Sequence, residues 1–157
     1  MATVWRLTPP QYAHDLTGEG SSMTGGRWNS PGRQMLYTSS HLSLSVLEVF
    51  VLIAPDLRDD LPDLTAVCLA VPDDAGVRTV SDAQFREFMA NAALLAACQA
   101  FGDTWLAAGV DLILAAPSVI VPEELNVMLN PAHPRMHEVA IVSARRFRFD
   151  PRLVRGG

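Results

Sequence analysis

The 157-residue chain contains no lysine, and each of its twelve basic residues is an arginine. This absence excludes a P-loop lysine, a Schiff-base lysine and a Ser–Lys dyad. The only two cysteines, Cys68 and Cys98, show no CxxC or Cys/His spacing, so we expect neither a disulfide framework nor a bound metal. No uninterrupted apolar run reaches about 18 residues, which argues against a membrane span.

Positive charge is also scarce, because the formal net charge is −5. This balance argues against a broad nucleic-acid-binding surface. The first residues lack the basic-then-apolar pattern of a signal peptide, so we expect a cytoplasmic protein. The length, with 49% hydrophobic and 18% charged residues, predicts one globular domain over residues 1–157.

Apolar runs between turn-forming residues predict several strands that do not alternate regularly with helices. This order favours an α+β fold over a doubly wound sheet. Strands are predicted at 4–7, 34–38, 64–71, 110–115 and 119–121, with a final strand or hairpin over 138–142 and 146–149.

Two helices are predicted around these strands. The first covers 41–53 and begins at a cap, Ser39 or Ser40. The second covers 82–108, with a break near Gly102-Asp103 and an end at Gly109. Residues 17–33 hold five glycines and are predicted to form a loop.

The loop at 17–33 carries residues suited to a nucleotide. It lacks the GxGxxG dinucleotide fingerprint. Its paired glycines, Gly25 and Gly26, let backbone approach a ligand closely, and the Arg27 guanidinium suits a phosphate. Trp28 and Tyr37 supply flat faces for a ring. The alternative is a surface loop with Arg27 solvated and Trp28 in the core.

Glu48 is a carboxylate in the apolar segment HLSLSVLEVFVLI, where helical spacing places it on one stripe with His41 and Ser45. Such a carboxylate is costly unless it is paired or faces a wet cleft. The alternative is a surface edge of the helix or a salt bridge to an arginine.

Ser118 lies between prolines in AAPSVIVP and has no GxSxG elbow, so a serine hydrolase using Ser118 and His133 is disfavoured. A satisfied core or turn serine is the alternative at this position. The four histidines show no metal-ligand spacing.

Together these motifs resemble the RES-domain family, the toxins of bacterial toxin–antitoxin modules, named for an arginine, a glutamate and a serine. The matching segments are WRLTP, GEGSSMTGGRWN, LYTS, LSVLE and APSVIVPEELNVMLNPAHP, and the ending FRFDPRL. The resemblance implies an ADP-ribosyltransferase-like fold, a split β-sheet core with flanking helices around an NAD cleft. It also implies consumption of NAD by hydrolysis, phosphorolysis or ADP-ribosyl transfer to a protein acceptor, and an antitoxin with a helix-turn-helix domain that covers the cleft.

Through this resemblance each candidate residue receives an expected role. Glu48 would oppose the oxocarbenium charge that develops as nicotinamide leaves. Arg6 and Arg27 would hold the pyrophosphate. Amides of the glycine loop, which includes the expected cofactor-binding residues Gly25 and Gly26, would assist them.

The two remaining roles concern the ribose. Tyr37 would stack on nicotinamide or bind the ribose, and Ser118 would orient Glu48 or the nicotinamide ribose. A non-catalytic nucleotide-binding module stays as the alternative function.

Overall fold

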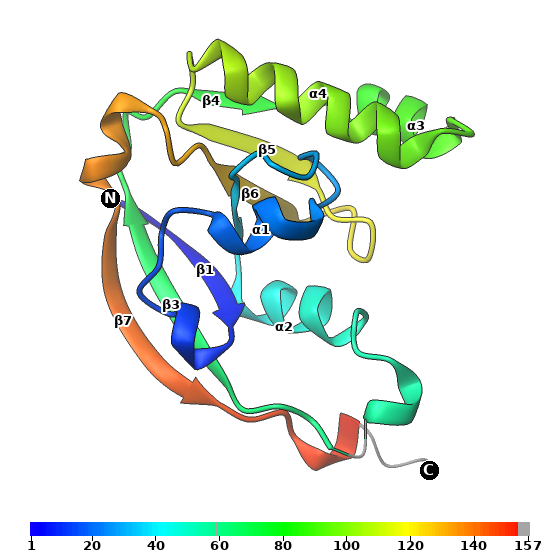
Figure 1. Ribbon diagram of the computed structural model, residues 1–157, viewed down its shortest axis with the longest axis vertical. Helices are drawn as coiled ribbons and strands as arrows, with labels where there is room; N and C mark the ends of the chain where they lie inside the picture. The colour runs from blue at the N-terminus through cyan, green and yellow to red at the C-terminus, as the bar shows by residue number, and fades with distance from the viewer. Residues whose placement is uncertain (59, 154–157) are drawn as a thin grey trace.

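Seven strands of the computed structural model form one mixed sheet in the order β4-β5-β6-β2-β1-β3-β7 (Figure 1). The structure describes residues 1–58 and 60–153, so the predicted domain limit at residue 157 lies outside the described residues. Neighbouring strands are antiparallel except β4 and β5, which run parallel. The strands are β1 (Ala2–Thr8), β2 (Leu36–Ser39), β3 (Leu64–Val71), β4 (Val77–Thr79), β5 (Ile113–Pro117), β6 (Leu125–Leu129) and β7 (Ala140–Phe147).

The sheet is split between β1 and β2. Across the described residues these two strands share a single registered pair, Trp5 with Ser39. By contrast, β1 pairs with β3 along its whole length, and β2 pairs with β6 from Leu36 to Ser39. Beyond the shared pair the two halves of the sheet diverge (Figure 1). The split sheet implied by the family resemblance is therefore present.

Four helices flank the two halves: α1 (Glu19–Thr24), α2 (Leu42–Phe50), α3 (Asp82–Ala90) and α4 (Leu94–Ala108). Helices α3 and α4 cover the half that contains β4, β5 and β6, whereas α2 follows β2 and lies at the opening between the halves (Figure 1). Short 3-10 turns complete the described chain at Pro10–Tyr12, Pro55–Leu57, Pro134–Glu138 and Pro151–Leu153. No helix in these ranges is long and apolar enough to cross a membrane.

Each half of the sheet has its own apolar core. Under α3 and α4, Trp28 and Met35 are buried together with side chains of β5 and β6. In the other half, α2 is almost entirely apolar, and its inner residues pack on Leu7, Leu64 and Phe149. Burial of this apolar surface therefore holds α2 in place and fixes the position of Glu48.

The α+β prediction is confirmed, and four strand predictions are close to the observed bounds. The strand at 64–71 agrees with β3, the strands at 4–7 and 34–38 overlap β1 and β2, and that at 110–115 overlaps β5. The final segment is one strand, β7, that joins the two predicted pieces. The helix at 41–53 is shorter in the structure and begins after His41, which makes no side-chain cap bond, so the predicted serine caps are wrong.

Two further predictions are wrong, one of a loop and one of a strand. Residues 17–33 are not only loop, because they contain the short helix α1, at the end of which the Gly25 amide donates to the Ser21 carbonyl. Residues 119–121 form no strand, because they lie in the connection from β5 to β6. The structure also contains β4 and β6, which the sequence pattern did not indicate.

The helix predicted at 82–108 is two helices, and the break is not at Gly102-Asp103. Instead, α3 ends before Asn91, whose side chain accepts from the Ala93 amide at 2.8 Å. Gly102 lies inside α4, where a Cβ atom would stand 1.6 Å from the Trp28 carbonyl oxygen. The glycine therefore permits close packing of the loop at 17–33 on α4. The predicted end of the helix at Gly109, with φ of 60°, is confirmed.

Candidate active site

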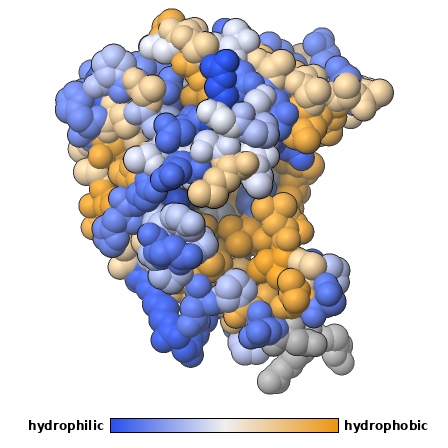
Figure 2. All heavy atoms as spheres, in the orientation of Figure 1, coloured by the Kyte–Doolittle hydropathy of each residue, from blue (hydrophilic) through white to orange (hydrophobic). Residues whose placement is uncertain are grey.

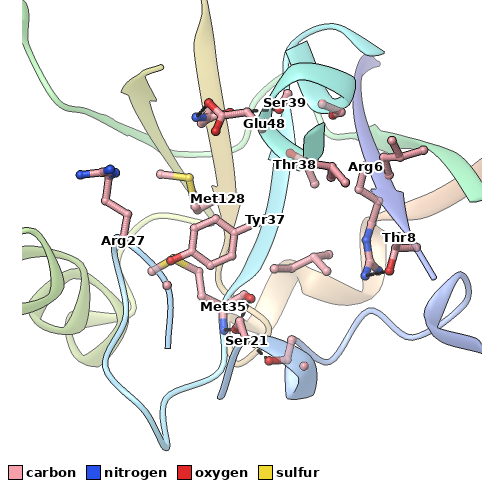
Figure 3. Close-up of a pocket in the computed structure, with 18 of the residues that line it drawn as sticks. Arg6, Thr8, Ser21, Arg27, Met35, Tyr37, Thr38, Ser39, Glu48 and Met128 are labelled. Carbon is pink, nitrogen blue, oxygen red and sulfur yellow. Dashed lines mark hydrogen bonds between the residues drawn. The ribbon is translucent and has the colours of Figure 1, made fainter. Parts of the chain in front are cut away.

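A cavity of about 750 Å³ opens where the two halves of the sheet diverge. Its walls come from β1, the loop around α1, β2, α2 and β6 (Figure 3). Apolar side chains gather beside it over the end of α2 (Figure 2), where Leu52 is 84% exposed. The predicted site residues Arg6, Gly25, Gly26, Arg27, Tyr37 and Glu48 all line this cavity.

Glu48 is half-buried on α2 and is held at one of its two carboxylate oxygens. The Ser118 hydroxyl donates to Oε1 at 2.8 Å, and the Asn126 side-chain amide donates to the same atom at 2.6 Å. Among the described residues no donor binds Oε2. The carboxylate is therefore fixed by protein at one oxygen and available to a ligand at the other.

Ser118 lies directly after β5 and is fully buried. Its Oγ accepts from the backbone amides of Ile120 and Val121 at 3.0 and 3.1 Å. These two bonds use the oxygen as an acceptor, so the hydroxyl hydrogen is directed at Glu48. Ser118 is thus a turn serine that also contacts Glu48. The structure therefore combines the two interpretations drawn from the sequence, a satisfied turn serine and a residue that orients the glutamate.

Asn126, on β6, was not recognised as a site residue in the sequence, although it stands in the PEELN segment. Its side-chain oxygen accepts from the Ser39 hydroxyl at 3.0 Å while its nitrogen donates to Glu48. Asn126 and Ser39 are also cross-strand partners in the β2–β6 ladder. The available signal was the isolated polar residue at the start of an apolar strand.

Arg6 lies on β1, on one wall of the cavity. Its guanidinium donates to the Asp15 carbonyl at 2.7 Å and to the Thr8 hydroxyl at 3.3 Å. Burial lowers the pKa of Arg6 below its ordinary value, and the nearby Asp15 carboxylate partly opposes this shift. The arginine is therefore held rigidly, with some of its donors already engaged.

Tyr37 presents its ring to the cavity but uses its hydroxyl within the protein. The hydroxyl donates to Asn29 Oδ1 at 2.6 Å and accepts from the Trp28 amide at 3.0 Å. Burial raises the pKa of Tyr37 above its ordinary value. Of the two predicted roles, the geometry favours stacking by the ring over hydrogen bonding to a ribose.

The glycine pair folds the loop beneath Tyr37. A Cβ atom on Gly26 would lie 2.5 Å from the Tyr37 hydroxyl oxygen, and Gly25 has φ of 76°. The Gly25 amide donates to the Ser21 carbonyl and the Gly26 amide to the Asn29 carbonyl. Both amides are thus engaged within the loop, and the part of Gly25 and Gly26 in cofactor binding stays a prediction.

Arg27 follows the glycines and lies on the opposite side of Tyr37 from Arg6 (Figure 3). No carboxylate of the described chain lies within ion-pair distance of it. The adjacent Trp28 is 2% exposed and packs edge-on against Phe88 and Phe101. Trp28 is thus a core residue, and the prediction that it offers a face to a ligand is wrong.

The predicted stripe of His41, Ser45 and Glu48 only partly faces the cavity. Ser45 is buried and donates to the Trp5 carbonyl at 3.0 Å, which ties α2 to the junction of the sheet halves. His41 is exposed, with Nδ1 3.6 Å from the Glu124 carboxylate. No group of three or more His, Cys, Asp or Glu side chains suited to a metal ion occurs within 1–58 and 60–153.

Comparison with known proteins shows what the chain is similar to. The model of a family described as "RES domain" matches residues 3–150. The chain is 34% identical over 166 residues to the Prs ADP-ribosylating toxin of Sphingobium sp. (strain YBL2), with 96% of each chain covered. It is 32% identical over 155 residues to Toxin Res of Photorhabdus laumondii subsp. laumondii, with 97% of each covered.

Among solved structures, a chain of the M. tuberculosis MbcT–MbcA toxin–antitoxin complex matches with a TM-score of 0.74. The match covers 97% of this chain and 86% of that one, at 18% identity. At this identity the likeness shows a shared fold.

Proposed function

We propose that this chain, which belongs to the RES domain family, is the toxin of a toxin–antitoxin pair and cleaves NAD between nicotinamide and ribose. Membership of the family, predicted from the sequence motifs, is confirmed by the family model and the relatives named as toxins. A relative named for ADP-ribosylation, 34% identical to this chain, supports NAD as the substrate.

The observation that carries the proposal is the state of the Glu48 carboxylate. Two donors hold Oε1, and the cavity wall on which Glu48 stands faces arginines on two further walls. A carboxylate in a cleft with separate arginines suits a substrate that combines a developing cation with a diphosphate.

The reaction requires little proton transfer to the leaving group. Nicotinamide departs from a pyridinium as a neutral molecule, and positive charge develops on the ribose. Oε2 of Glu48 opposes that charge and accepts a hydrogen bond from a ribose hydroxyl, while the Tyr37 ring stacks on nicotinamide. Ser118 acts through Glu48 and does not attack as a nucleophile, because it is fully buried and its oxygen already accepts from two backbone amides.

Arg27 is the main ligand of the pyrophosphate in this proposal. Its guanidinium has no carboxylate partner in the described chain, whereas Arg6 already donates to Asp15 and Thr8. A planar guanidinium binds phosphate oxygens through two parallel bonds. Arg6 then fixes the opposite end of the dinucleotide from the wall on β1.

The partner is an antitoxin with a helix-turn-helix domain that covers this cleft. Similarity of fold to a chain from a toxin–antitoxin complex supports the pairing. The ADP-ribosyl group goes to a protein acceptor, to water or to phosphate, and the name of the 34% identical relative, an ADP-ribosylating toxin, supports transfer to an acceptor molecule. Expression without the antitoxin is accordingly expected to arrest growth and to lower cellular NAD.

The test follows NAD, nicotinamide release and labelled protein in a cell lysate. The wild-type chain and Glu123→Gln, an exposed carboxylate outside the cavity, are expected to release nicotinamide. Glu48→Gln is expected to lose about 100- to 1000-fold in rate, because it keeps volume but removes the charge.

Each outcome has a distinct meaning. A labelled protein band indicates transfer, and nicotinamide without label indicates hydrolysis or phosphorolysis. NAD binding without nicotinamide release by the wild-type chain would refute the enzyme and favour a non-catalytic nucleotide-binding module. Near wild-type turnover in Glu48→Gln would place the chemistry elsewhere.

A further inference from the structure

We propose that Asn126 is a positioning residue that fixes the Glu48 carboxylate through Oε1 and aims Oε2 at the substrate. This inference rests on the proposed function of Glu48. Asn126 contacts the glutamate from β6, whereas Glu48 itself stands on α2 and Ser118 follows β5. The carboxylate is thus held from two elements outside its own helix.

The orientation of the Asn126 amide is determined by its neighbours. Its two hydrogen-bond partners are the Ser39 hydroxyl at 3.0 Å and Glu48 Oε1 at 2.6 Å. If the amide were flipped, its oxygen would face a carboxylate oxygen at 2.6 Å with no hydrogen between them. Only the orientation that donates from Nδ2 to Glu48 and accepts from Ser39 satisfies both contacts.

Two donors therefore point at Oε1, which leaves no room for a proton on that atom. Ser118 must donate because its oxygen already accepts from two amides, and Asn126 must donate because Ser39 occupies its oxygen. Oε2, which no donor of the described residues binds, stays available to the substrate. In this way Ser118 and Asn126 together hold the Glu48 carboxylate in a fixed plane.

The support for Asn126 extends to the junction of the sheet. Ser39 is its cross-strand partner and is also the β2 residue paired with Trp5 of β1. The Trp5 carbonyl in turn accepts from Ser45, one turn before Glu48 on α2. A continuous hydrogen-bonded path thus places Asn126 and α2 against the same fixed point of the split sheet.

The kinetic test compares two substitutions at this position. Asn126→Ala is expected to lower kcat for NAD consumption by about 10- to 100-fold, the loss of one charge-assisted hydrogen bond, with KM changed less than about threefold. Asn126→Asp keeps the side-chain size but places a second carboxylate beside Glu48.

The aspartate variant provides a pH signature that a packing role would not produce. When the two carboxylates share one proton, Asp donates to Glu48 much as Asn126 does. When that proton is lost, the two charges repel and displace Glu48. The activity of Asn126→Asp relative to wild type is therefore expected to rise as the pH falls from about 8 to 5. A ratio that is independent of pH, or wild-type kcat in Asn126→Ala, would overturn the proposal.

A second measurement tests the geometry without any activity. A carboxylic acid whose folded-state pKa is raised by a neighbouring charge loses stability as the pH rises. Asn126→Asp should thus become less stable relative to wild type with rising pH, and adding Glu48→Gln should remove that loss. If the loss remains in the double variant, Asn126 does not act on Glu48 and the proposal fails.

The kinetic test and the stability measurement together also separate this proposal from the proposed function. The proposed function, and with it the catalytic part of this proposal, would be refuted if the wild-type chain consumed no NAD while Glu48→Gln still removed the pH-dependent stability loss of Asn126→Asp. Normal NAD consumption with no stability coupling between positions 126 and 48 would refute the positioning role alone.

Discussion

Replacing Ser118 by alanine removes one hydroxyl group that serves three partners. The hydroxyl donates to Glu48 and accepts from the amides of Ile120 and Val121. The substitution should therefore weaken the chain in two ways, through the orientation of the carboxylate and through the turn that follows β5.

The magnitude can be worked out from these contacts. A hydrogen bond to a charged group contributes about 1.5–3 kcal/mol, and each bond to an amide about 0.5–1.5 kcal/mol. Ile120 is 37% exposed, so we expect water to reach its amide and replace part of that loss. We expect about 2–4 kcal/mol less free energy of unfolding, or a Tm lower by about 6–12 °C.

Activity should fall more sharply than substrate affinity. Without Ser118, Asn126 alone holds the Glu48 carboxylate, which is then free to rotate. We expect kcat for nicotinamide release to fall by about 10- to 100-fold with a small change in KM for NAD. Kinetics should be measured well below the Tm of the variant, so that unfolding does not contribute.

The matched control is Ser143→Ala, an exposed serine on β7 with no side-chain hydrogen bond in the described chain. It should leave both Tm and kcat at wild-type values. A Ser118→Ala protein that is destabilised as expected but retains wild-type kcat would refute the link from Ser118 to catalysis, since the turn would then be its whole role.

Three further predictions follow from other contacts. Arg27→Lys should raise KM for NAD by about 5- to 100-fold, because lysine lacks the planar, two-pronged guanidinium of arginine. The control Arg33→Lys, at an exposed position of the same loop, should leave KM unchanged. An unchanged KM in Arg27→Lys would leave Arg6 as the phosphate ligand. Gly102→Ala should lower the free energy of unfolding, measured by denaturant titration, by about 3 kcal/mol, because the alanine Cβ would overlap the Trp28 carbonyl. Wild-type stability would mean that the loop at 17–33 shifts easily to make room. Saturating NAD and added salt should each weaken antitoxin binding in a titration, and no effect of NAD would place the two binding sites apart.

Local sequence patterns were sufficient for the parts of the fold that local forces determine. The apolar run of β3 and the left-handed Gly109 depend on residues next to them, and both were predicted. Gly102 and Asp103 resemble a helix break only when tertiary contacts are ignored. In the structure the glycine admits the Trp28 carbonyl, and the aspartate accepts from the amide and hydroxyl of Ser30.

The same limit explains why the site was predicted only in part. Glu48 and Ser118 were identifiable as polar residues in apolar segments, although they lie 70 residues apart. Asn126 escaped because residues 119–121 were interpreted as a strand. Those residues instead form the turn that pairs β5 with β6, and this hairpin returns Asn126 to the side of Ala116, two residues before Ser118. Recognising the hairpin from its prolines and glutamates would have placed Ser118 and Asn126 at the same end of the sheet, and with them the second donor to Glu48.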